Sequence, residues 1–212
     1  MPLAPELNEF STASPRIASY NYTDLDEGAG YVKYYGFAAD TSSATTYGLT
    51  KSVVFSNPAY SGADSSASPF DADFDLSFNI AKTLNGDVIA NIPMWCYGSI
   101  NNSSTVAVTL TIYHYNATTG ETSLGTATSD SIDNNAGENT ENKLLCFRIP
   151  ITSTHFKRTD ILRMNISATV VRSDGTSRGG VRHDPAGRTP SGTQGNFESS
   201  VLSFHVPFRI DS

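Results

Sequence analysis

Apolar and polar residues alternate one by one along several stretches of this chain, and this period of two constrains the fold more than any other feature. Residues 73–80, for example, place Phe74, Leu76, Phe78 and Ile80 on one side and polar residues on the other. Successive side chains of a β-strand point to opposite faces, so the alternation predicts strands with one buried face. The other alternating stretches lie at residues 31–38, 88–97, 106–115, 144–151, 162–170 and 202–210.

These stretches predict a single all-β domain over residues 31–212. No stretch of about ten residues keeps the helical period of about 3.6, and the eight or nine expected strands follow one another closely. The expected architecture is an antiparallel two-sheet sandwich of the jelly-roll-like type. Asn85-Gly86-Asp87 predicts a tight hairpin turn, because Asn-Gly readily adopts the positive φ that such turns need. Pro93 lacks a backbone donor and predicts a bulge or an edge strand.

The charge balance excludes some classes of protein. Only 17% of the residues are charged, and the net charge is −7, which argues against a nucleic-acid-binding protein. No apolar run approaches the roughly 18 residues of a membrane span, and the first residues do not resemble a signal peptide. Acids dominate up to residue 142, whereas the chain from Lys143 onward is basic. This division favours either association with a copy or another charged partner, or neutralisation of the two parts within one domain.

Two segments lack the strand period and carry the candidates for partner contacts. Residues 1–30 contain three prolines and a Gly-Ala-Gly break, which predicts an extended N-terminal arm. Residues 172–196 are rich in glycine and arginine, and a long loop in a compact domain is often functional. Guanidinium groups there could grip carboxylates of a neighbouring protein, or could only keep an exposed loop soluble. The candidate partner-binding residues are Arg178, Arg182, His183 and Arg188.

The two cysteines, Cys96 and Cys146, lie inside apolar strand-like stretches. This placement predicts two small buried side chains in a chain made in a reducing cytosol. A single disulfide between them stays open, because the spacing of two cysteines does not decide their pairing.

One short pattern resembles a catalytic motif. Residues 175–179 match the nucleophile pattern G-x-S-x-G, and His183 and Asp184 follow closely. No helical pattern follows the serine, however, and adjacent His and Asp side chains cannot both orient on one serine. We therefore expect no enzyme, no catalytic residue and no cofactor.

Metal ligation is also not expected. Asp71, Asp73 and Asp75 lack the following glycine and the distal glutamate of a calcium-binding loop, which leaves at most a weak cation site. The histidines are dispersed and show no metal-ligand spacing.

Aromatic residues suggest one alternative function. Trp95 and Tyr97, together with Tyr113 and Tyr115, could form a platform for a sugar ring, or could pack as large side chains of a sheet. The first reading would make the chain a carbohydrate-binding or receptor-binding module of a tail fibre or an adhesin.

Three segments resemble tailed-bacteriophage virion proteins, and more narrowly the β-sandwich proteins that decorate or cement capsids. They are residues 30–40 (GYVKYYGFAAD), 181–188 (VRHDPAGR) and 203–209 (SFHVPFR). The resemblance implies a structural, non-enzymatic virion protein on the capsid exterior, made in the host cytoplasm. It also implies binding to the major capsid protein, homo-oligomerisation with a trimer favoured, and no direct contact with nucleic acid or membrane. An extended arm, the role that residues 1–30 would suit, commonly reaches over the capsid lattice in such proteins.

Overall fold

The computed structural model describes residues 29–41, 44–52, 70–97, 104–134, 140–172, 178–181, 183 and 202–209. Within these ranges the chain forms strands and no helix, so the all-β prediction is confirmed, and no helix there is long and apolar enough to cross a membrane. The strands are β1 (Ala29–Thr41), β2 (Ala44–Thr50), β3 (Phe70–Ser77), β4 (Lys82–Tyr97), β5 (Ser104–Asn116), β6 (Gly120–Thr128), β7 (Ile132–Asn134), β8 (Thr140–Phe156), β9 (Ile161–Arg172), β10 (Arg178–Val181) and β11 (Ser203–Arg209).

All described strands belong to one hydrogen-bonded sheet, in the order β4-β11-β1-β2-β3-β9-β5-β6 along its main path. The long strand β4 pairs with β8 on one side, and with β11 and then β10 on the other. Strand β5 likewise pairs with β9 on one side, and with β6 and β7 on the other. We call β8, β4, β10, β11 and β1 the first half of the sheet, and β3, β9, β5, β6 and β7 the second half.

Strand β2 joins the two halves, and this connection corrects the expected architecture. It pairs antiparallel with β1 but parallel with β3, through Gly48 opposite Asp75. The sheet is therefore mixed and continuous, where the alternation predicted antiparallel strands in two separate sheets. Periodicity identifies strands and their faces, but it carries no information on which strands become neighbours.

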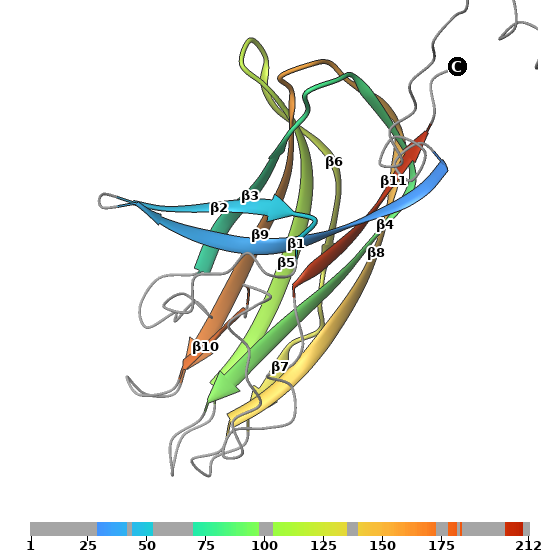
Figure 1. Cartoon of the computed structure of the whole chain (residues 1–212). Helices are drawn as coiled ribbons and strands as arrows, with labels where there is room; N and C mark the ends of the chain where they lie inside the picture. Colours follow the sequence, from blue (N-terminus) through green and yellow to red (C-terminus); the bar gives the residue numbers. More distant parts are fainter. Residues whose placement is uncertain are drawn as a thin grey trace, which may run out of the picture.

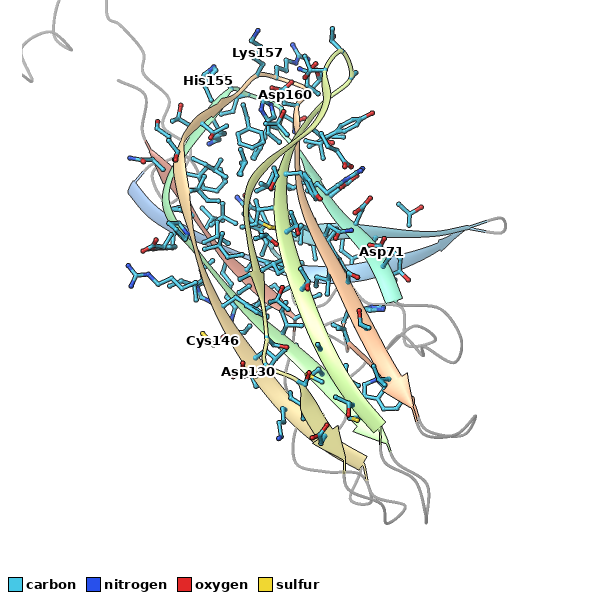
Figure 2. The ribbon with its side chains drawn as sticks, turned by 180° about the vertical axis from the view of Figure 1, so that it is seen from behind. Asp71, Asp130, Cys146, His155, Lys157 and Asp160 are labelled. Carbon is cyan, nitrogen blue, oxygen red and sulfur yellow. The ribbon has the colours of Figure 1, made fainter. Side chains whose placement is uncertain are left out.

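The sheet curls so that its two halves face each other, as Figure 1 shows. Phe78, which follows β3, packs edge-to-face on Phe208 of β11 with ring centroids 5.9 Å apart. A Cβ added to Gly125 of β6 would lie 2.5 Å from Cγ2 of Ile149 of β8. Inward-facing side chains from both halves thus fill one shared core, as Figure 2 shows. The largest fully buried ones are Phe74, Phe156, Phe204, Leu84, Ile92, Met94, Leu110, Ile112, Ile149, Leu162, Met164 and Ile166.

Two local predictions for β4 need correction. Asn85-Gly86-Asp87 is not a hairpin turn: the strand continues, and the ladder to β8 shifts register between Leu84 and Gly86, where Gly86 has a φ of 123°. The positive φ predicted from Asn-Gly is therefore present at Gly86, but it forms part of a bulge and not of a hairpin turn. Pro93 is buried in an interior strand, at the break between the partners β11 (last paired with Asn91) and β10 (first paired with Met94). A residue without a backbone donor fits at this gap in the ladder.

The cysteines lie on opposite faces of the first half. Cys96 is buried in the core, whereas Cys146 is exposed on β8, and both are free thiols. The expectation of two buried side chains is thus correct for Cys96 and wrong for Cys146, because residue 146 falls on the outward parity of β8.

Candidate functional site

The outer face of the second half carries an ordered array of polar side chains, which we call the polar face. Its residues line up in rows across β3, β9, β5 and β6, because β9 pairs in continuous register with β3 and β5, while the β5–β6 ladder shifts once, between Ile112 and Tyr113. The rows are Asp71–Ser167–Thr109–Thr128, Asp73–Asn165–Thr111–Thr126, Asp75–Arg163–Tyr113–Ser123 and Ser77–Ile161–Tyr115–Glu121. Asp73 and Asp75 thus line the solvent side of a strand, as the alternation predicts.

Arg163 of β9 is the centre of this array. Its Nε and one terminal nitrogen donate to the two carboxylate oxygens of Asp75 at 2.8 and 2.7 Å. The other terminal nitrogen reaches Glu121 at 2.5 Å and Asp73 at 3.0 Å, and the guanidinium lies 5.0 Å from the ring centroid of Tyr115. These contacts tie β9 to β3, β5 and β6. The hydrogen bonds to Asp75, more than the other contacts, raise the pKa of Arg163 far above its ordinary value, against the opposing effect of burial.

Amide and hydroxyl groups extend the array along the strands. The Asn165 side chain donates to Asp71 at 2.6 Å and to Asp73 at 2.8 Å. On the other side, Thr109 and Thr111 of β5 bond the hydroxyls of Thr128 and Thr126 of β6 at 2.9 and 3.0 Å. The polar face is therefore linked by side-chain bonds across all four strands.

The named rows of this face carry four carboxylates and one guanidinium, which leaves three net negative charges. The four are Asp71, Asp73, Asp75 and Glu121. Within the described ranges, no three His, Cys, Asp or Glu residues gather in a way that could hold a metal ion. At the three aspartates of β3, Asn165 and Arg163 occupy carboxylate oxygens that a cation would need.

A second polar cluster closes the turn between β8 and β9, at the top of Figure 2. The buried Asp160 carboxylate accepts hydrogen bonds from the backbone N–H of Lys157 at 2.9 Å and from the side chain of Asn116 at 2.7 Å. It also lies 2.7 Å from Nε2 of His114. Burial alone would raise the pKa of Asp160, but these hydrogen bonds outweigh it and hold the pKa below its ordinary value. Thr159 of the same turn has a φ of 78°. No nucleophilic side chain is bonded to this cluster in the described residues, and its role is to fasten the turn.

The predicted partner-binding residues fall partly outside the described residues. Arg178 begins β10, opposite Tyr97, but its side chain is not described, and Arg182 and Arg188 lie outside the described ranges. His183 is 1% exposed and packs edge-to-face on the rings of Tyr47 and Phe74, at 5.5 and 6.0 Å. Its imidazole therefore belongs to the core and presents no surface to a partner. Residues 175–177 of the serine pattern also lie outside the described ranges.

The aromatic residues of the predicted sugar platform do not form one surface. Trp95 is half-buried on the outward side of β4, in the first half, and the Tyr97 side chain is not described. Tyr113 and Tyr115 lie on the polar face, on the outer side of the second half. The two halves face each other across the core, so the Trp95 ring points away from the rings of Tyr113 and Tyr115.

Sequence reasoning named Asp73 and Asp75 only as part of a weak cation site, and missed Arg163 and its contacts with them. The signal was present as charged residues at alternate positions of two strand-like stretches, around Asp73 and Arg163. Finding the contact required the pairing of β3 with β9 and its register, which place Asp75 opposite Arg163.

Comparisons with known proteins leave the family open. No family model and no curated protein matches the chain. Among solved structures, a CocE/NonD family hydrolase from Staphylococcus aureus is 10% identical, with a TM-score of 0.46 over 84% of this chain and 36% of that one. An α-amino acid ester hydrolase is 11% identical, with a TM-score of 0.42 over 84% and 35% of the two chains. The structure of infectious bursal disease virus, Gx strain, is 12% identical, with a TM-score of 0.26 over 70% and 36%.

The chain thus spans little more than a third of the length of each of these proteins. At these identities and TM-scores the likeness assigns neither an activity nor a fold family.

Proposed function

We propose that this chain is a structural virion protein that decorates and reinforces a tailed-phage capsid, binding the major capsid protein on the exterior. In this proposal the two halves of the curled sheet act as the layers of a jelly-roll-like sandwich. The sandwich is a rigid base, and the predicted arm of residues 1–30, of which residues 1–28 lie outside the described residues, makes the capsid contacts together with the segment around Arg182.

The attachment of the arm to the sheet is the observation that carries this proposal. The arm joins β1 at Ala29, and β1 pairs with β11 over Ala29–Tyr35 and with β2 over Tyr35–Thr41. Tension on the arm along β1 would load the seven β1–β11 residue pairs in shear, so that they must break together. Each net hydrogen bond contributes only about 1 kcal/mol, so an anchor for a load-bearing arm needs many of them. Strand β1 provides them by pairing first with β11 and then with β2.

The segment around Arg182 has a similar support. Val181 and His183, on either side of it, are both buried, at 0% and 1% exposure. The residues that flank Arg182 in the sequence are thus held by the core. A segment anchored in this way loses less freedom when a partner binds than a free loop does.

Deletion of residues 1–28 tests the proposal. Capsids from a phage lacking this gene would be incubated with the full chain or with residues 29–212, and binding measured by co-sedimentation and electron microscopy. We expect the full chain to saturate the capsids, and the truncated chain to bind at least about a hundred-fold more weakly because its multivalent contacts are lost. An unchanged urea midpoint shows that the truncated domain is folded. Saturation of capsids by the truncated chain would refute the arm mechanism.

A carbohydrate- or receptor-binding module of a fibre or adhesin is the second candidate. The observation in its favour is that Trp95 lies on the outward side of β4 and is not fully buried. Glycan-array binding that is abolished by Trp95→Ala, with the fold intact, would support this candidate. Capsid binding by the Trp95→Ala chain at the wild-type level would favour decoration.

A further inference from the structure

The polar face has no layer of the described chain packed on its outer side, and its side chains are already fixed in position. Arg163 is 17% exposed, whereas the Asp73 and Glu121 side chains that it holds are each 41% exposed. A surface whose charged groups are held by neighbours loses little conformational entropy when a partner binds. Tyrosine and arginine, both present here, are also enriched in protein interfaces.

The charge on this face is unbalanced, and another part of the same chain carries the opposite charge. Three net negative charges stay on the polar face after Arg163 is counted. Residues 178–188 carry Arg178, Arg182 and Arg188 against Asp184, and are net positive by two. The partly exposed carboxylates are acceptors of the kind that guanidinium groups bind with two parallel hydrogen bonds.

We propose that the polar face is a docking surface for the arginine-rich segment, residues 178–188, of a second copy of this chain. The occupant is chosen by this charge complementarity. The contact is heterologous, because the surface and the segment are different parts of the molecule. Copies would therefore associate head to tail, closing into a ring where the geometry allows it. This inference does not depend on the arm contacts proposed for the capsid, but it uses the same segment around Arg182, so that one copy of the segment binds either the capsid or a second copy of the chain.

The first test is the salt dependence of self-association of the full chain, measured by sedimentation equilibrium. Roughly 10 mM salt has a screening length of about 30 Å and 1 M salt one of about 3 Å. We expect concentration-dependent association at the low salt concentration, with a dissociation constant at least about ten-fold larger at the high one. A chain that stays monomeric at low salt, or that associates equally at both, would overturn the proposal.

Two variants separate the two sides of the contact. Asp71→Asn/Glu121→Gln removes two charges from the polar face and keeps acceptors for Asn165 and Arg163. Arg178→Gln/Arg182→Gln/Arg188→Gln removes the positive charges of the segment. Each alone should raise the dissociation constant at least about ten-fold. The matched control, Asp87→Asn/Asp130→Asn, removes two charges elsewhere: Asp87 pairs with Arg148 on the first half, and Figure 2 places Asp130 away from Asp71.

Mixing the two variants is the decisive measurement. The polar-face variant keeps an intact segment and the segment variant keeps an intact polar face, so a head-to-tail contact predicts one 1:1 complex that grows no further. Native mass spectrometry with one variant isotope-labelled would identify it. No complex on mixing, or a control variant that weakens association as much as the polar-face variant, would refute the proposal.

Discussion

The two outer faces of the sheet are held together in different ways. On the second half, Arg163, Asn165 and the threonine pairs link β3, β9, β5 and β6 into one bonded array. On the first half, one row runs Lys33–His205–Ile89–Arg148 across β1, β11, β4 and β8. Arg148 of that row forms an ion pair with Asp87 of β4, and the arginine side chain is 76% exposed. Thr83 of β4 and His155 of β8 are also hydrogen-bonded, at 3.1 Å. We call this second surface the mixed face.

The difference separates two sources of sheet stability. Both halves share the core, so both gain from burial of the same apolar side chains. The charge-assisted bonds from Arg163 to Asp75 are partly buried, whereas the Arg148–Asp87 pair is largely exposed on the arginine side, and partly buried bonds contribute more than exposed ion pairs. The mixed face, with exposed Tyr31, Leu144 and Cys146, therefore depends more on its backbone ladder and on the core beneath it.

Replacing Arg163, at the centre of the polar face, should lower the free energy of unfolding more than any other substitution considered below. Arg163→Met leaves Asp75, Asp73 and Glu121 facing one another without a cation, and should lower the free energy of unfolding by about 2–3 kcal/mol after allowance for solvent screening. Arg148→Met on the mixed face is the matched control, and its free energy of unfolding should equal that of the unmodified chain within experimental error. Urea denaturation followed by tryptophan fluorescence measures both. Equal effects at the two arginines would remove the distinction between the faces.

The sequence predicted the strands well and their partners poorly. Alternation identified the core-facing side of β3, β5, β9 and β11, because burial on one face imposes a period of two. The prediction was wrong for Ile80, which follows the end of β3 at Ser77 and is exposed. It could not show that β2 joins the halves through a parallel pair, which depends on tertiary placement. The prediction of a hairpin turn at Asn85-Gly86 was wrong, because a positive φ occurs in bulges as well as in hairpins.

The candidate site was predicted even less completely, for a related reason. Glycine and arginine content drew attention to residues 172–196, yet His183 within that segment packs in the core. Arg163 was overlooked because its partners Asp75 and Glu121 lie far from it in the sequence. Local composition identifies unusual segments, whereas a charged array across strands appears only once the register is known.

The second prediction concerns the turn between β8 and β9, where Asp160 should make the free energy of unfolding depend on pH. The pKa of Asp160 is lower in the folded chain than its ordinary value, so the ionised carboxylate stabilises the fold above the unfolded pKa of about 3.9. This contribution is lost as the pH falls through the folded pKa. Asp160→Asn should therefore lower the free energy of unfolding most at about pH 7, and progressively less below about pH 4.

Urea titrations of both chains between about pH 7 and pH 3 measure this difference. Asp130→Asn, at an exposed position before β7, serves as the control for removal of a carboxylate. A destabilisation by Asp160→Asn that stays constant over the whole range would show that the turn is fastened by shape and packing, independent of the carboxylate charge.

The smallest effect is expected from the hydroxyl pairs of the polar face. In Thr111→Val the hydroxyl bond to Thr126 is lost, but Thr126 keeps its bond to the Leu110 carbonyl at 3.2 Å, and valine retains the branched shape that suits a strand. The free energy of unfolding should change by less than about 0.5 kcal/mol. Thr126→Val removes both bonds and should cost more than Thr111→Val. A loss above about 1 kcal/mol for Thr111→Val would mean that the hydroxyls act cooperatively with the Arg163 array, and that the whole polar face is one energetic unit.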